Sequence, residues 1–506
     1  CFSLVVNGQT GHSFDHFCGS HQGRSVWLKK YQATPQAYAK GGDTTVYIPM
    51  TIHILGTDSG SGYYSVRSLL DAMCTLNTTF EQTGLQFYIA GEILYHNNTA
   101  YYVHSTVLEG AEMMFEYNVP NTLNTYFVSD PAGNCGYNLP YAGIANAKSC
   151  SGPDDITWSH EVGHALSLPH PFLGWEGGVS YDGSVDHNFN NPAPDFVTYD
   201  YTFFQDTLIL DTLIIDTAFV ELVDRSNCDV AADGFCDTDS DYLAQRWSCN
   251  SDDVSPITQR DPDGVSFRSD GSLVMNYAND ACQDRFSLEQ TGAMRAFLYD
   301  ERTSWVSTAT PLAPILSEVT VIAPVEGVTV GGQTATLTWE AVANATQYLV
   351  QISRLSSFSS AVTETYVTAS TSFETEELLD DRTYYWRVRP FNAYSTCQDF
   401  SERESFVIDH DLVNLANSIH TLASWTIRPQ PVSSGQLLEL VWQLTDRWQG
   451  ELQIINSLGQ VIDQQTVYLQ AGRNTKTIAT HQLAAGLYFL RLSNGSTQAV
   501  RKIVVE

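Results

Sequence analysis

The sequence is poor in basic residues and contains no long apolar run. Its 506 residues include 25 Lys and Arg against 57 Asp and Glu, which gives a formal net charge of −32. A surface of this sign repels nucleic-acid phosphates and anionic lipid headgroups, so we expect no nucleic-acid partner. The best candidate for a membrane helix, residues 206–220, carries an aspartate at every fifth position. Because a span needs about 18 or more uncharged apolar residues, we expect no transmembrane segment.

The chain has ten cysteines, more than a cytosolic protein of this composition requires. Because several of them cluster, disulfides formed in an oxidising compartment are the preferred interpretation. Proximity in the sequence favours the pairs Cys228–Cys236 and Cys135–Cys150, although spacing cannot fix connectivity. Cys397 has no candidate partner within its own predicted domain.

A chain of this length is expected to form several domains, and residues 45–305 are predicted to form one α/β unit. Strand-like runs and helical spacing of apolar residues alternate there. The predicted strands are 45–55, 85–90 and 122–128, and the predicted helices are 66–80 and 154–168. Acidic residues in the first turn of the second helix would suit the helix dipole. Residues 173–227 have no regular pattern, and we interpret them as an inserted loop region.

Residues 1–44 are predicted to contain a signal-peptide remnant and a pro-segment. The apolar residues 1–6 precede Asn-Gly-Gln-Thr, which is typical of the end of a signal peptide; an ordinary first strand is the alternative. Residues 12–42 have no obvious core of their own, as expected of a pro-segment.

The stretch most informative about chemistry has His-Glu-Val-Gly-His at 160–164. His160 and His164 stand four residues apart on a predicted helix, so both imidazoles leave one face and can bind one ion. His170 follows six residues later and completes a three-histidine set, which leaves a fourth position open, as a catalytic zinc needs. Glu161 is placed to act as general base on a water molecule that zinc activates. A helix with two surface histidines is the alternative, and the third histidine counts against it.

A second element, Ser-Leu-Val-Met-Asn-Tyr at 272–277, resembles the Met-turn of metzincin proteases. In that resemblance Met275 lies beneath the metal and Tyr277 helps to hold the reacting oxyanion. From about residue 45 to 302 the sequence resembles the pappalysin family of metzincins. The resemblance rests on the zinc motif, on Asp-Gly-Phe-Cys-Asp-Thr at 233–238 and on Met-Asn-Tyr-Ala-Asn-Asp-Ala-Cys at 275–282.

This resemblance implies a zinc endopeptidase with a Cys249–Cys282 disulfide and calcium near the active site. Aspartates available for calcium are Asp233, Asp237, Asp239, Asp241, Asp261 and Asp263. The chain departs from the family at Ser167, where metzincins have glycine. If the chain reverses there with positive φ, serine costs roughly 1 kcal/mol or more.

Beyond residues 309–314 the sequence has only short alternating runs separated by turn signals, which predicts β-sandwiches. Residues 314–409 resemble a fibronectin type III domain, with Trp339, Tyr348 and a tyrosine corner at Tyr385. Residues 424–506 resemble the C-terminal sorting domain of the type IX secretion system. This resemblance implies that the type IX secretion machinery is a partner of the protein. A plain adhesive sandwich is the alternative for this last module.

Cys18, followed by glycine in the predicted pro-segment, resembles the cysteine-switch segment of some metzincins. A thiolate is a strong zinc ligand and would occupy the open fourth position in a latent state. A Cys1–Cys18 disulfide and an unpaired surface thiol are the alternatives.

The sequence therefore predicts a multidomain protein: an α/β metzincin-like catalytic domain, with a mixed sheet and a zinc-motif helix, followed by two all-β sandwich domains. We expect a secreted or cell-surface zinc endopeptidase that acts on extracellular proteins or peptides, with one catalytic Zn²⁺ and Ca²⁺ as a second candidate ion. The alternatives are a non-catalytic adhesin on the same scaffold and a zinc hydrolase with a non-peptide substrate.

Overall fold

The computed structural model describes residues 16–20, 23–42, 44–201, 213–410, 419–495 and 497–506. The chain divides into two compact units, residues up to 313 together with 393–397, and residues 314–392 together with 398–506. The predicted signal-peptide remnant lies outside the described residues. Among those residues, no helix is long and apolar enough to cross a membrane.

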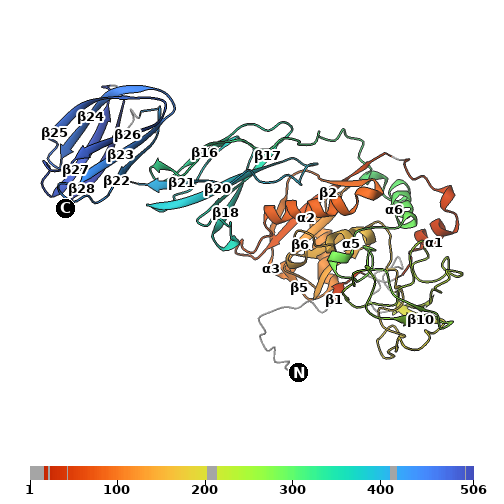
Figure 1. Ribbon diagram of the computed structural model, residues 1–506. Coiled ribbons are helices and arrows are strands. Elements are labelled where there is room, and N and C mark those ends of the chain that lie inside the picture. The colour runs from red at the N-terminus through yellow and green to blue at the C-terminus, as the bar shows by residue number, and fades with distance from the viewer. Residues whose placement is uncertain (1–15, 21–22, 43, 202–212, 411–418, 496) are drawn as a thin grey trace. The chain divides into compact units, whose positions relative to one another are not determined.

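A seven-stranded mixed sheet forms the centre of the first unit (Figure 1). Its strand order is β1-β8-β9-β6-β2-β3, and β4 also pairs with β2. The strands are β1 (His16–Cys18), β2 (Val46–Gly56), β3 (Leu85–Ile89), β4 (Leu94–Asn97), β6 (Leu123–Val128), β8 (Asn134–Leu139) and β9 (Gly143–Ala147). Only β8 and β9 pair antiparallel, and the other neighbours run parallel. The three strands predicted from the sequence correspond to β2, β3 and β6.

Helices lie against both faces of this sheet, which explains why β2 is buried along almost its whole length. The α-helices described in the unit are α1 (Val26–Ala33), α2 (Val66–Thr79), α3 (Thr99–Tyr102), α4 (Val107–Tyr117), α5 (Thr157–Ala165) and α6 (Leu288–Asp300). Strand β6 shows the two faces, because successive side chains of a strand point in opposite directions. Phe127 contacts Trp158 of α5, whereas Tyr126 belongs to the same hydrophobic cluster as Met113 of α4.

The helix that carries the zinc motif starts later than the sequence predicts. It begins at Thr157 rather than Asp154, and no acidic residue lies in its first turn. Asp154 has a φ of +65°, which is incompatible with a helix. Asp155 is used before the helix, where its carboxylate accepts the Gly152 N–H at 3.0 Å. Asp154 and Asp155, which the sequence predicts in the first turn of the helix, therefore precede the helix.

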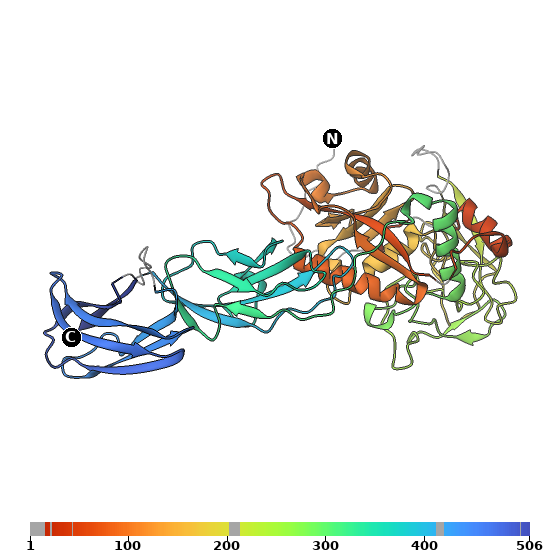
Figure 2. The ribbon, with the colours of Figure 1, turned by 90° about the horizontal axis from the view of Figure 1, so that it is seen from above.

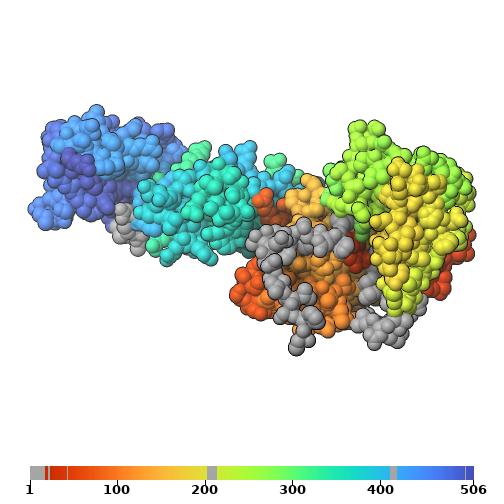
Figure 3. Space-filling model, turned by 90° about the horizontal axis from the view of Figure 1, so that it is seen from below, coloured from red at the N-terminus to blue at the C-terminus, as the bar shows by residue number. Residues whose placement is uncertain are grey.

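The segment after this helix is mostly irregular, as predicted, but it contains an antiparallel ribbon of β10 (Phe196–Asp200) and β11 (Ile215–Phe219). Figure 3 shows the segment, yellow to green, as a contiguous surface of the first unit. The remaining strands described in the first unit form two short pairs, β5 (Val103–His104) with β7 (Asp130–Pro131) and β12 (Gln259–Arg260) with β13 (Ser266–Phe267).

Residues from the predicted pro-segment belong to the packing of this unit. Trp27 and Tyr31 of α1 are buried, and the Trp27 indole donates to Asp300 of α6 at 2.7 Å. The ring of Trp27 also lies edge-on to Phe297, with centroids 4.9 Å apart. Helix α1 is therefore packed against α6.

The described residues contain four disulfides, Cys74–Cys397, Cys135–Cys150, Cys228–Cys236 and Cys249–Cys282. The partner of Cys397, for which the sequence offered no candidate, is Cys74 on α2. Residues 393–397 belong to the first unit: the Ala393 carbonyl accepts the Ile89 N–H at 3.1 Å, and Tyr394 stacks on Tyr88 with centroids 4.3 Å apart.

The second unit contains two β-sandwiches (Figure 2). The sheets of the first are β14 (Val321–Ala323), β16 (Thr336–Trp339) and β19 (Ser372–Glu374), and β15 (Val328–Gly331), β21 (Glu404–Asp409), β20 (Arg382–Phe391), β17 (Gln347–Ser353) and β18 (Thr363–Thr368). The sheets of the second are β22 (Leu422–Arg428), β23 (Leu437–Leu444) and β26 (Gly472–Ala479), and β25 (Val461–Leu469), β24 (Trp448–Asn456), β27 (Gly486–Ser493) and β28 (Gln498–Val505). Each sandwich has its own hydrophobic cluster.

The predicted tyrosine corner at Tyr385 is wrong by one residue. Tyr384 is buried, and its hydroxyl accepts the Leu379 N–H at 2.8 Å. Because side chains alternate along β20, the inward face holds Tyr384 and Trp386, and Tyr385 lies on the opposite face.

Candidate metal centre

The end of α5 places the first two candidate ligands and turns the chain toward the third. The Leu168 N–H bonds to the Gly163 carbonyl at 3.0 Å and the Ser167 N–H to the His164 carbonyl at 2.9 Å. These two bonds form a Schellman motif when the residue that donates the second of them is left-handed. Ser167 is that residue, with a φ of +74°. The reversal brings His170 back to the face of α5 that carries His160 and His164.

The three histidines converge through their Nε2 atoms. The separation is 3.1 Å from His160 to His164, 3.1 Å from His160 to His170, and 3.0 Å from His164 to His170. Zn–N bonds of about 2.0–2.1 Å in tetrahedral geometry place nitrogens roughly 3.3 Å apart. The observed spacing is close to what three imidazoles on one zinc ion would adopt.

The Nδ1 atoms of His160 and His164 show which nitrogen of each ring carries the proton. His160 Nδ1 lies 2.8 Å from the Val274 carbonyl and His164 Nδ1 lies 2.8 Å from the Leu168 carbonyl. A carbonyl only accepts, so both Nδ1 atoms are protonated. Neutral rings then present Nε2 lone pairs to the centre, which is the tautomer that binds a metal.

Burial keeps these imidazoles neutral. Burial and the neighbouring imidazoles lower the pKa of His160 and His164 well below the ordinary value, and burial lowers the pKa of His170 to about 3. His170 Nδ1 lies 3.2 Å from Oε1 of Glu176. With the His170 proton on Nδ1, three Nε2 lone pairs face one another at about 3 Å and repel unless a cation lies between them. The donor set therefore fits zinc.

Cys18 supplies a fourth donor from the N-terminal segment. Its Sγ lies 3.5 Å from His164 Nε2, and its Sγ and the three ring nitrogens all lie within 4.8 Å of one another. Zn–S of about 2.3 Å and Zn–N of about 2.0–2.1 Å predict roughly 3.6 Å between sulfur and nitrogen. Cys18 is a free, buried thiol. Burial, and then the Glu161 carboxylate, raise the pKa of this thiol well above its ordinary value, so a thiolate here requires a cation.

Strand β1 holds Cys18 at this position by pairing in parallel with β8. Cys18 is opposite Gly136, and the Gly19 N–H bonds to the Gly136 carbonyl at 2.8 Å. The N-terminal segment therefore occupies the edge of the sheet beside the histidines.

Glu161 is fully buried next to the first ligand, and burial raises its pKa to about 7. Its Oε2 accepts the Ser20 hydroxyl at 2.7 Å. The Ser20 Oγ in turn accepts the Asn138 N–H at 2.8 Å. The same short segment that brings a thiol to the histidines thus places a hydroxyl on the candidate general base.

Met275 packs against the helix that carries the zinc motif, and Tyr277 packs against His170. A Cβ on Gly163 would lie 2.3 Å from the Met275 sulfur, so the thioether packs directly against the backbone of α5. The ring of Tyr277 lies edge-on to His170 with centroids 4.9 Å apart, and its hydroxyl is 3.5 Å from the Cys18 carbonyl oxygen. Burial raises the pKa of Tyr277 well above its ordinary value, which keeps the phenol a hydrogen-bond donor.

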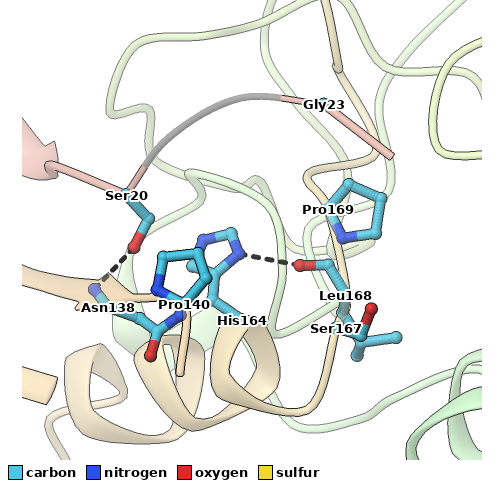
Figure 4. Close-up of a pocket in the computed structure, with 8 residues that line it drawn as sticks. All are labelled: Ser20, Gly23, Asn138, Pro140, His164, Ser167, Leu168 and Pro169. Carbon is cyan, nitrogen blue, oxygen red and sulfur yellow. Dashed lines mark hydrogen bonds between the residues drawn. The ribbon is translucent and has the colours of Figure 1, made fainter. Parts of the chain in front are cut away.

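A small pocket lies beside His164 (Figure 4). It is lined by Ser20, Gly23, Asn138, Pro140, His164, Ser167, Leu168 and Pro169. Ser20 lies beside Asn138 of β8, and Gly23 lies on the other side of the pocket, near Pro169.

Sequence reasoning missed Ser20, which donates to Glu161, and Glu176, whose carboxyl group contacts His170. Neither residue belongs to a motif or a regular spacing that points to the metal. It also expected calcium in the acidic loops. The only cluster of metal-ligating side chains found in the described residues is the one formed by Cys18 and the three histidines. Asp233 and Asp241 accept hydrogen bonds from backbone N–H groups and hydroxyls instead. The calcium expectation has no support there.

Residues 427–506 match the secretion system C-terminal sorting domain. This domain indicates export by the type IX machinery and a secreted or cell-surface location, which confirms the expectation from the sequence. No curated protein sequence matches the chain.

Among solved structures, a mutant of promirolysin from Tannerella forsythia is 16% identical, with a TM-score of 0.35, over 57% of this chain and 97% of that chain. The FN1–FN3 domains of chicken CNTN1 are 12% identical, with a TM-score of 0.17, over 39% of this chain and 65% of that chain. A fibronectin type III domain derived from a human protein is 18% identical, with a TM-score of 0.16, over 20% of this chain and 81% of that chain.

Proposed function

We propose that this exported protein is a zinc-dependent endopeptidase that acts on extracellular proteins or peptides and is latent in the form described here. The observation that carries the proposal is the convergence of three imidazole Nε2 atoms beside a buried carboxylate. An adhesin on the same scaffold would have no need for this arrangement, which is unfavourable without a cation.

His160, His164 and His170 would hold the zinc ion, with Cys18 as a fourth ligand in the latent form. A bound zinc ion supplies a Lewis acid that polarises a peptide carbonyl and acidifies water. Glu161 takes a proton from the attacking water and delivers it to the leaving amine, and its raised pKa suits both steps near neutral pH. Tyr277, which remains protonated, donates a hydrogen bond to the carbonyl oxygen as negative charge develops on it.

Substrate would bind at the edge of β8 that the N-terminal strand β1 covers in the latent form. The Gly136 carbonyl, which accepts the Gly19 N–H, becomes free when β1 leaves. An extended peptide can then pair with the edge of β8 through its own main chain, which aligns the scissile bond beside the histidines.

Latency would have two components that act on different groups. The Cys18 thiolate occupies the coordination position that substrate or water needs, and the Ser20 hydroxyl occupies the carboxylate that must accept a proton. Removal of either component alone should give partial activity, and removal of both should give more.

The experiment compares metal content and hydrolysis of casein for the parent chain, Cys18→Ala, Ser20→Ala and the double variant. Glu161→Gln is then introduced into the double variant, because glutamine keeps the volume but cannot act as base. We expect one zinc per chain in all variants. Casein hydrolysis should rise from the parent chain to the single variants and again to the double variant. Glu161→Gln should then reduce the activity of the double variant roughly 10²–10⁴-fold or more.

Two results would contradict the proposal. A parent chain that binds no zinc removes the metal centre, and undiminished casein hydrolysis by the Glu161→Gln variant removes the mechanism. Equal activity of parent and double variant would instead refute only the latency.

A further inference from the structure

The three candidate ligands differ in what fixes the orientation of their rings. His160 and His164 donate from Nδ1 to main-chain carbonyls, which no substitution of a side chain removes. His170 Nδ1 lies 3.2 Å from Oε1 of Glu176, a side-chain carboxylate. His170 also lies outside the helix, so its backbone is held by a turn rather than by α5.

Glu176 is itself fixed by the loop in which it lies. Its Oε2 accepts the Gly174 N–H at 2.7 Å, so the two carboxylate oxygens have different partners. Gly174 has a φ of +98°, and a Cβ there would lie 2.6 Å from a methyl group of Val197 on β10. The next residue, Trp175, stacks on Tyr242 with centroids 4.9 Å apart. The carboxylate is therefore presented to His170 by a tightly packed turn.

We infer that Glu176 is the positioning residue of the metal centre: it holds the proton of His170 on Nδ1 and so keeps the Nε2 lone pair directed at the metal. The inference rests on the proposed zinc function. Without this acceptor, neutral His170 can carry its proton on Nε2, and that tautomer cannot bind a cation. A carboxylate acceptor also makes the imidazole a stronger donor toward the metal.

The test is zinc affinity, measured by equilibrium competition with a chelator on the full chain. Glu176→Ala should weaken zinc binding about 10–100-fold, the usual effect of removing such an acceptor. Glu176→Gln keeps one oxygen for His170 but turns an amide N–H₂ toward the Gly174 N–H, so we expect a smaller loss. Asp182→Ala is the matched control, because this exposed carboxylate in the same loop region bonds only to neighbouring residues in the described contacts; its zinc affinity should equal that of the parent.

The thermal midpoint of each metal-free variant separates positioning from a general structural role. A structural role lowers the midpoint of metal-free Glu176→Ala and leaves zinc affinity within twofold of the parent; that result overturns the inference. If Glu176→Ala does not fold, Glu176→Gln decides, and parental zinc affinity in that variant also overturns it. Failure of the parent chain to bind zinc would refute the proposed function instead.

Discussion

Replacing Ser167 by glycine tests how the chain reverses between the second and third candidate ligands. Ser167 has a φ of +74° at the end of the zinc-motif helix, and both main-chain bonds of the Schellman motif are independent of its side chain. A Cβ in the left-handed region costs about 1–2 kcal/mol. Glycine removes this strain but loses roughly 0.5–1 kcal/mol more conformational entropy on folding. With the central values of both ranges, the net stabilisation from the backbone alone is about 0.5–1 kcal/mol.

A side-chain hydrogen bond opposes this gain. The Ser167 Oγ lies 3.1 Å from the Ser25 Oγ, at the N-terminus of α1. A bond of this kind contributes about 0.5–1.5 kcal/mol, and partial exposure favours the lower end. Ser167→Gly in the parent chain should therefore change stability little. In a Ser25→Ala background, where the bond is already absent, the same substitution should stabilise by the full 0.5–1 kcal/mol.

The assay is thermal unfolding of all four members of this double-mutant cycle, with and without zinc. For a unit of this size 1 kcal/mol corresponds to roughly 2–4 °C. Asp154→Gly is the matched control, because Asp154 also has positive φ, +65°, next to the same helix. It should stabilise equally with either residue at position 25. If Ser167→Gly destabilises the Ser25→Ala chain, the assignment of backbone strain to Ser167 is wrong.

Two further predictions concern other parts of the first unit. Proteolysis in the largely exposed residues 308–314 should leave the two fragments joined through Cys74–Cys397, so they separate on a denaturing electrophoretic gel only after a reductant is added. In a Cys397→Ser chain the fragments should separate without reductant. Burial lowers the pKa of His53 to about 4, so between about pH 6.5 and 4 the unfolded chain binds the proton that the folded chain refuses, and stability falls as pH falls. His53→Asn should reduce that slope by up to about 1.4 kcal/mol per pH unit in urea unfolding; an unchanged slope would exclude His53 as its source.

Periodicity located the central strands well, because buried parallel strands are continuous apolar runs. Prediction from the sequence failed where one local pattern is compatible with two structures. The acidic residues before the zinc-motif helix were assigned to its first turn, but Asp155 bonds to the Gly152 N–H outside the helix. Likewise, two adjacent tyrosines in β20 fit the tyrosine-corner pattern equally well, and only the direction of the core selected Tyr384.

The sequence by itself determined the elements of the site that depend on local geometry. Histidines four residues apart share a helix face whatever surrounds the helix, and a reversal is needed before His170 can join them. Tertiary structure decided everything that depends on distant contacts. Cys18 meets His164 across 146 positions of sequence, and Cys74 meets Cys397 across 323. No periodicity encodes such encounters, because they follow from sheet pairing and from the packing of irregular loops.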